Sequence, residues 1–201
     1  MEAFDQLAEI YQGEHSRNPF QAALIERVNA LLPGDRSVLD LGCGTGVPTA
    51  KIFTDSGRPV VGIDISEGML RLAREQVPEA DFRHGDIAAL PADLGTFGAV
   101  TAFFSLLMLS KADIVATLAK VPGWLEPGGY FAVGMVNFDA DFVPHEFMGV
   151  PVNVSGYLEP DLKAALTAAG LSVLDIETVE FTPENGPAES QIFALCQKPR
   201  T

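Results

Sequence analysis

The chain has 201 residues, of which 47% are hydrophobic, and its 13 basic and 27 acidic residues give a formal net charge of −14 at pH 7. This length suffices for one sizeable core, so we expect a single domain over residues 1–201. An excess of acidic side chains repels nucleic-acid phosphates and anionic lipids, so neither nucleic acid nor a membrane is an expected partner.

Cysteine usage and hydropathy favour a cytoplasmic protein. Two cysteines, Cys43 and Cys196, are too few for a disulfide framework and lack the spacing of metal ligands. The first residues contain neither a basic segment nor an apolar core, so we do not expect a secretory signal. The longest nearly apolar run, residues 99–109, is about half of the roughly 20 residues that span a bilayer. We therefore expect a soluble protein with free thiols in a reducing cytoplasm, while its oligomeric state stays open.

The N-terminal part predicts two helices. Apolar residues recur at spacings of three and four over residues 3–32, and Asn18-Pro19 divides this stretch. We interpret residues 1–32 as a helical cover that lies either on the core or on a ligand site.

From residue 37 onward, apolar runs alternate with helical patterns. The predicted strands are 37–41, 60–64, 80–83, 97–104, 130–136, 171–180 and 190–197. The predicted helices are 47–55, 66–76, 111–121 and 159–169. This alternation predicts an α/β fold with a Rossmann-like, doubly wound parallel sheet. The link between the last two strands is too short for a crossover helix, so these two strands are predicted to be antiparallel.

Residues 137–157 interrupt the alternation. They contain several aromatic residues and two prolines without a clear periodicity. Long irregular segments of a compact domain are often functional. We interpret this segment as an insertion that forms the substrate pocket.

A glycine turn and two acids mark the ends of the first three strands. An apolar run ends in alternate glycines within Val38–Gly46, and the next β-branched run ends at Asp64, twenty residues after Gly44. Gly42 and Gly44 have no Cβ, so the backbone can adopt a positive φ and approach a ligand closely. Asp64 can accept hydrogen bonds from both hydroxyls of a ribose, and Asp86 ends the third strand where an adenine amino group would need an acceptor. The pattern predicts an adenosine-containing ligand across the strand ends.

Dinucleotide-dependent dehydrogenases share a glycine turn followed by an acid. The spacing here is Gly42-x-Gly44-x-Gly46 and not the G-x-G-x-x-G that brings a helix start against a pyrophosphate. The second acid, Asp86, and the closing antiparallel pair also depart from the dinucleotide plan. An NAD-dependent oxidoreductase is the first alternative interpretation.

Four motifs in order resemble those of the class I S-adenosylmethionine-dependent methyltransferases. Residues 38–46 are similar to the first motif of that family, residues 60–66 to the second, residues 84–87 to the third, and residues 125–129 to the loop before the fifth strand. The resemblance implies a seven-stranded, mostly parallel sheet in the order 3-2-1-4-5-7-6 with an antiparallel last strand. It also implies S-adenosylmethionine as the cofactor and S-adenosylhomocysteine as its product.

The same resemblance implies how the methionine and ribose parts of the cofactor would be held. Gly42 and Gly44 would lie beneath the methionine part, and Asp40 would reach its amine directly or through a water molecule. Asp64 would hold the ribose. The alternative for Asp40 is that it merely orients the turn.

Further residues would border the adenosine and the sulfonium. Ile65 would pack on the adenosine, while Asp86 and the amide of Ile87 would read the adenine. Tyr11, from the helical cover, would close over the sulfonium end, and Phe104 would border the same site. The alternative for Asp86 is a cap on the next turn of the chain.

Methyl transfer is an in-line displacement at a carbon that the sulfonium charge already activates, so alignment is the main task. His145 is the candidate general base, since an ordinary histidine is suited to that role at neutral pH. A solvated loop histidine is the alternative.

The residues after the fourth strand narrow the choice of acceptor. Residues 103–106 are Phe-Phe-Ser-Leu, which lack both the Asn/Asp-Pro-Pro-aromatic pattern of amide and base methylases and the metal-binding acid of catechol-type enzymes. We expect metal-independent O- or N-methylation of a small, largely hydrophobic organic acceptor. The residues expected to surround it are Phe104, Leu107, Met108, Phe138, Phe142, Phe147 and Tyr157. A protein that binds S-adenosylmethionine without transferring its methyl group is the second alternative.

Overall fold

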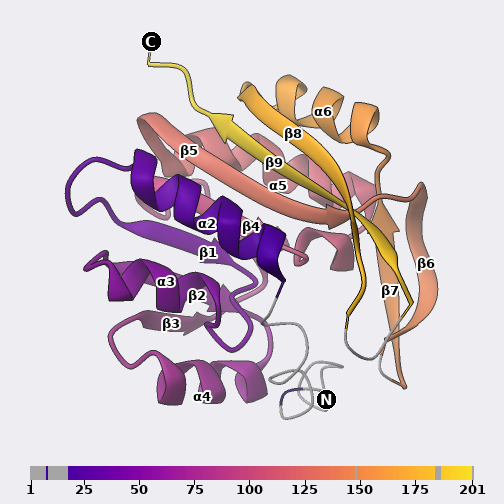
Figure 1. Cartoon of the computed structure of the whole chain (residues 1–201), viewed down its shortest axis with the longest axis horizontal. Coiled ribbons are helices and arrows are strands. Elements are labelled where there is room, and N and C mark those ends of the chain that lie inside the picture. Colours follow the sequence, from indigo (N-terminus) through magenta and orange to yellow (C-terminus); the bar gives the residue numbers. More distant parts are fainter. Residues whose placement is uncertain (1–7, 9–17, 148, 184–186, 201) are drawn as a thin grey trace.

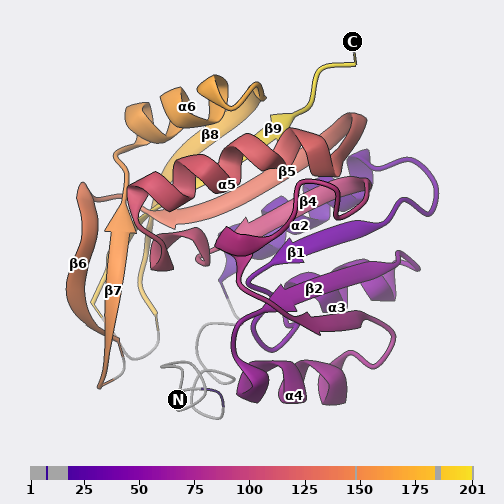
Figure 2. The same cartoon turned by 180° about the vertical axis from the view of Figure 1, so that it is seen from behind.

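A seven-stranded sheet runs through the molecule, with helices on both of its faces (Figures 1 and 2). The computed structural model describes residues 8, 18–147, 149–183 and 187–200. The strands lie in the spatial order β3 (Asp81–His84), β2 (Val60–Asp64), β1 (Val38–Leu41), β4 (Phe97–Phe103), β5 (Leu125–Val136), β9 (Glu189–Gln197) and β8 (Ser172–Phe181). β9 is antiparallel to both of its neighbours, and the other pairs are parallel. Since β8 and β9 are the sixth and seventh strands of this sheet along the chain, the predicted order is confirmed.

Each face of the sheet carries its own apolar core. The helices α2 (Pro19–Leu31), α3 (Thr49–Asp55) and α4 (Glu67–Gln76) contribute to the core on one face. The helices α5 (Lys111–Trp124) and α6 (Glu159–Ala168) contribute to the core on the other. Side chains of a strand alternate between faces, so on β1 Val38 belongs to the first core and Leu39 to the second. The strands in the middle of the sheet are therefore apolar almost throughout.

Two helices begin where the sequence signals their start. Asn18 caps α2, because its side-chain oxygen accepts hydrogen bonds from the amides of Phe20 and Gln21, and Pro19 occupies the first helical position. Ser66 caps α4 by accepting from the amide of Met69. The predicted division at Asn18-Pro19 thus coincides with the start of α2. Of the predicted helix before it, the structure describes only Ala8, which is buried beside Met69 and Leu72 of α4.

Residues 137–157 form a β-hairpin, so the prediction of an irregular segment is wrong. β6 (Ala140–Phe147) and β7 (Val150–Gly156) pair antiparallel in a sheet of their own. Figures 1 and 2 show this hairpin beyond the carboxyl ends of the parallel strands. Nearly every side chain of β6 is exposed, so the strand shows no apolar alternation that would reveal it in the sequence.

Two element boundaries also differ from the predictions. α5 continues past Pro122 to Trp124, whose fully buried indole donates to the carbonyl of Pro91 at 2.9 Å and fixes the last turn. β5 begins at Leu125, which pairs with Phe97 before a shift in register. The short 3₁₀ helices η2 (Ile87–Ala89) and η3 (Leu106–Met108) were not predicted.

Both cysteines are buried, and they are unpaired, as expected. No helix within the described ranges is both long and apolar enough to cross a membrane.

Candidate active site

The carboxyl ends of the parallel strands border a cavity of about 280 Å³. Its lining comes from the strand ends, from η2 and η3, and from the hairpin. The lining residues are Gly42, Gly44, Asp64, Ile65, Met69, Gly85, Asp86, Ile87, Phe103, Phe104, Ser105, Met108, Leu109, Phe142, Val152 and Asn153. The structure therefore brings seven of the predicted cofactor residues around one space: Gly42, Gly44, Asp64, Ile65, Asp86, Ile87 and Phe104. Tyr11 lies outside the described residues.

Two positions of the turn after β1 require glycine, each for a different structural reason. Gly42 and Gly44 both have left-handed backbones, with φ of 70° and 53°. A Cβ on Gly42 would lie 2.3 Å from the Cβ of Ser105, so a side chain there would collide with the segment after β4. A Cβ on Gly44 would meet no heavy atom within 4 Å. Gly44 thus leaves open space at the cavity, whereas Gly42 accommodates a neighbouring segment that the sequence pattern does not reveal.

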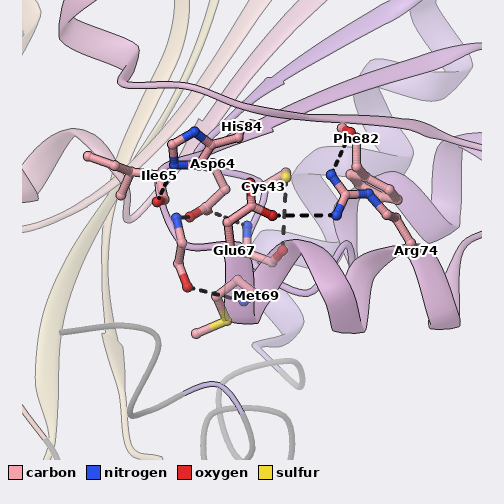
Figure 3. Close-up of polar contacts among 10 residues, drawn as sticks. Cys43, Asp64, Ile65, Glu67, Met69, Arg74, Phe82 and His84 are labelled. Atoms are coloured by element: carbon pink, nitrogen blue, oxygen red, sulfur yellow. Dashed lines mark hydrogen bonds and ion pairs between the residues drawn. The ribbon is translucent and has the colours of Figure 1, made fainter. Parts of the chain in front are cut away.

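Asp64 joins the glycine turn to the start of α4. One of its carboxylate oxygens accepts from the amide of Gly44 at 2.8 Å and the other from the amide of Ser66 at 2.9 Å. Figure 3 shows the carboxylate among these contacts, with the ring of His84 beside it. His84 donates from Nε2 to the carbonyl of Ile65 at 2.9 Å, because a carbonyl oxygen can only accept. These bonds hold the tip of β2 in a fixed position at the cavity.

Asp86 both caps η2 and lines the cavity, so the two interpretations of this residue are compatible. Its side chain accepts from the amide of Ala88 at 2.9 Å. The loop is also held from α5, where the ammonium of Lys120 donates to the carbonyls of Ala88 and Leu90 at 2.9 and 3.0 Å. Ile87 is buried, whereas Ile65 exposes 39% of its surface at the rim of the cavity.

Asp40 lies in the middle of the sheet, beside a second cavity of about 40 Å³. The residue is only 2% exposed and accepts a hydrogen bond of 2.6 Å from the hydroxyl of Thr101 on β4. Burial raises the pKa of the Asp40 carboxyl to about 7, and the nearby charge of Asp64 contributes in the same direction. Gln21 of α2 and Thr49 line the same small cavity. Thr101 was not predicted as a site residue, although it is the only residue with a polar side chain in β4.

The opposite side of the large cavity is mostly apolar. Of the residues expected to surround an acceptor, Phe104, Met108 and Phe142 line it. Leu107, Phe138 and Tyr157 belong to, or pack against, the apolar core, and Phe147 is not among the lining residues. Val152 and Asn153 of the hairpin line the cavity and were not foreseen.

His145 is exposed on β6 and does not line the cavity. It lies directly opposite Val152, which does. Because directly opposed residues of an antiparallel pair share a face, the side chain of His145 is on the same face of the hairpin as that of Val152. Among the described residues, no three His, Cys, Asp or Glu side chains are grouped so that they could hold a metal ion.

Comparisons with known proteins agree with this architecture. A family model described as a methyltransferase domain matches residues 38–129. An uncharacterized methyltransferase from Synechocystis sp. is 31% identical over an alignment that covers 72% of this chain and 70% of that protein. Demethylmenaquinone methyltransferase from Renibacterium salmoninarum is 36% identical over 55% of this chain and 44% of its own length. The chain spans about half the length of several curated relatives that it matches.

A solved structure shares the fold over nearly the whole chain. The 1,6-didemethyltoxoflavin-N1-methyltransferase from Burkholderia thailandensis, solved with 1,6-didemethyltoxoflavin and S-adenosylhomocysteine bound, superimposes with a TM-score of 0.73. The alignment covers 98% of this chain and 84% of that chain, at 19% sequence identity. At this identity the similarity establishes the fold alone.

Proposed function

Because the chain belongs to the class I S-adenosylmethionine-dependent methyltransferase family, we propose that it transfers a methyl group to a small, largely hydrophobic organic acceptor. The acceptor atom is an oxygen or a nitrogen, the transfer is an in-line displacement, and no metal takes part. Family membership leaves the NAD-dependent alternative without support.

One observation carries the proposal. The cavity of about 280 Å³ has the acids and the glycine turn of the sequence motifs on one side and apolar side chains on the other. Gly44, Asp64 and Asp86 represent the first side, and Met108 and Phe142 the second. A site of this kind suits a polar nucleoside and an apolar acceptor that meet in one space.

The residues present fit the cofactor of this family. Gly44 leaves open space where a side chain would otherwise project, and buried Asp40 lies in the adjoining small cavity, where it can pair with an ammonium group. Asp64 accepts from the ribose hydroxyls, and Asp86 with the amide of Ile87 reads the adenine. S-adenosylmethionine, when bound, supplies a methyl group that its sulfonium sulfur already activates.

The remaining work of the protein is to align the acceptor and to keep water away. Met108, Leu109 and Phe142 surround the acceptor with apolar surface, which excludes water from the reacting atoms. Where the acceptor arrives protonated, His145 takes up its proton from the hairpin side.

The test is the affinity for S-adenosylhomocysteine, measured by titration calorimetry. We expect micromolar binding by the parent protein, no binding of NAD, and a dissociation constant about tenfold higher or more for Asp64→Ala, because the ribose hydroxyls lose their acceptor. Asp93→Ala serves as the matched control, since Asp93 is an exposed acid that does not line the cavity.

Asp64 also bonds the amides of Gly44 and Ser66, so its removal affects the turn as well as the ligand. Thermal unfolding of each variant therefore accompanies the titrations. A parent protein that fails to bind S-adenosylhomocysteine would contradict the proposed function. Asp64→Ala with parental affinity would contradict the role given to this acid.

A further inference from the structure

Two phenylalanines line the large cavity with a backbone conformation that bulky residues rarely adopt. Phe104 and Phe142, with φ of 54° and 51°, are the only residues other than glycine with a positive φ in the described part of the chain. Both lie at the large cavity. A left-handed backbone at a bulky residue is strained, and such strain is typically found at active sites and ligand clamps.

A bulge in β6 directs Phe142 at the cavity. The pairing of β6 with β7 passes from Ala140 opposite Gly156 to Val143 opposite Val154, so two residues of β6 face the single residue Ser155. Phe142 is one of these two. A bulge of this kind reorients a side chain and is common beside active sites. Although apolar, Phe142 is 46% exposed, so its ring is accessible to a ligand in the cavity.

The neighbours of Phe142 hold it in this conformation. Its amide donates to the hydroxyl of Ser155 at 2.8 Å, and Ser155 is fully buried. The preceding residue, Asp141, accepts from the amide of Lys111 at the start of α5, at 2.8 Å. The Lys111 ammonium in turn lies 4.8 Å from the centre of the Tyr157 ring. The base of the hairpin is thereby attached to α5, and the position of Phe142 is fixed.

Phe104, at the end of β4, is also held in place by its neighbours. Its amide donates to the carbonyl of Gly134 at 2.8 Å, so the pairing of β4 with β5 extends to this residue. Its ring meets that of Phe193 edge to face, with centroids 5.8 Å apart. The cavity thus receives one fixed aromatic ring from the end of β4 and another from the hairpin.

On the basis of the methyl transfer proposed above, we infer that Phe142 determines acceptor specificity and that the acceptor is a planar aromatic compound. Glycine would adopt the backbone conformation of Phe142 without steric strain, so the ring itself is the feature that requires explanation. Aromatic side chains bind flat rings by offset stacking or edge contact more favourably than they bind saturated rings of similar size. The hairpin supplies Asn153 as a polar partner for a hydroxyl or amine of such a compound.

Two probes of similar size and different shape test this inference. The flat 2-naphthol and its saturated counterpart decahydro-2-naphthol are titrated by calorimetry into protein saturated with S-adenosylhomocysteine. We expect the parent to bind 2-naphthol about fivefold more tightly than the saturated alcohol, from the added aromatic contact. Phe142→Leu, which keeps the apolar surface and removes the ring, should reduce this preference to about twofold or less, what remains coming from Phe104. Phe142→Gly should bind 2-naphthol about tenfold more weakly than the parent while melting at no lower temperature, because its backbone strain is relieved.

Val143→Ala is the matched control, because Val143 is the exposed neighbour of Phe142 and does not line the cavity. It should retain the parental preference. A parent without any preference for the flat probe, or Phe142→Leu with the parental preference, would overturn the inference while S-adenosylhomocysteine still binds. Loss of S-adenosylhomocysteine binding by the parent itself would instead refute the proposed function on which the inference rests.

Discussion

Asp40 keeps its proton in the folded protein over a pH range in which an exposed aspartate has lost it. Burial raises its pKa from 3.8 to about 7, against the hydrogen bond from Thr101, which favours the carboxylate. Between these two values the folded state binds a proton that the unfolded state has released. The contribution of Asp40 to the free energy of unfolding therefore falls as the pH rises from about 4 to about 7 and is constant above that range.

The direction of this pH dependence gives a prediction for the stability of the protein. The free energy of unfolding of the parent should decrease between pH 4.5 and pH 8 by up to about 3 kcal/mol more than that of Asp40→Asn, because this window covers roughly 2.5 units of the pKa difference at about 1.36 kcal/mol per unit. Urea denaturation at a series of pH values measures the difference. Parallel curves for the two proteins would show that the carboxyl does not titrate in this way.

His145 is the residue whose role in the proposed reaction depends most on the hairpin. His145→Ala should lower the rate of S-adenosylhomocysteine formation by about a hundredfold and leave the affinity for that product unchanged, because only proton removal is lost. Glu146→Ala is the control, since successive residues of a strand point to opposite faces. Equal rates for His145→Ala and the parent would remove this histidine from the mechanism.

The sequence predicts site residues that belong to local patterns, and misses those that depend on distant contacts. Asp64 ends β2, and Asp86 follows the end of β3 by two residues; because the ends of neighbouring parallel strands meet at one edge, their convergence could be foreseen. Position 42 must be a glycine because Ser105 occupies the space that a side chain would need, and the hydroxyl of Thr101 orients Asp40. Each of these contacts joins residues about sixty positions apart, and no local pattern encodes such a pairing.

At the scale of elements, α2 depends on a single residue from another part of the chain. Buried Arg58 donates to the carbonyls of Asn29 and Leu32 at 2.9 Å and of Gly34 at 2.7 Å, and also to the Asn29 side chain. The last carbonyls of a helix have no partner within it. The guanidinium therefore supplies the donors that the end of α2 lacks.

Arg58→Ala should lower the free energy of unfolding by about 3 kcal/mol, because several buried acceptors lose a charged donor. Arg58→Lys should recover less than half of that loss, since a compact ammonium cannot reproduce the fork of a guanidinium. Urea denaturation measures both. Arg71→Ala, at an exposed position on α4, is the control and should change stability by less than about 0.5 kcal/mol. Full stability of Arg58→Lys would contradict this account of the helix end.

The elements that sequence patterns reveal are those packed on the core. α4 shows both an N-cap at Ser66 and an apolar face, and its predicted bounds agree closely with those observed. β6 has neither, since its residues are exposed and gain their pairing from β7 alone. Pro122 in α5 is the opposite case: burial of Trp124 outweighs the tendency of proline to end a helix. Tertiary contacts thus decide the elements on which local signals are weak or contradictory.

At the scale of the whole molecule, the alternation of strands and helices predicts a doubly wound sheet, and the resemblance to the methyltransferase family implies the order of its seven strands, which the structure confirms. Parallel neighbours require crossovers, and the short last link forces an antiparallel pair, so few arrangements remain. The acceptor side of the cavity could not be predicted in the same way. It combines the end of β4, η3 and a hairpin that lies apart from the main sheet, and no rule of sheet topology places such a hairpin.

Because β6 and β7 form a separate sheet, the hairpin has a further consequence for protein engineering. Residues 140–156 can be exchanged for a hairpin of another length or composition without breaking any hydrogen bond of the seven-stranded sheet. Asp40, Asp64 and Asp86 all lie outside the exchanged segment. On the proposed function, we expect a transplanted hairpin joined at residues 139 and 157 to alter the choice of methyl acceptor while the nucleoside half of the cavity remains intact.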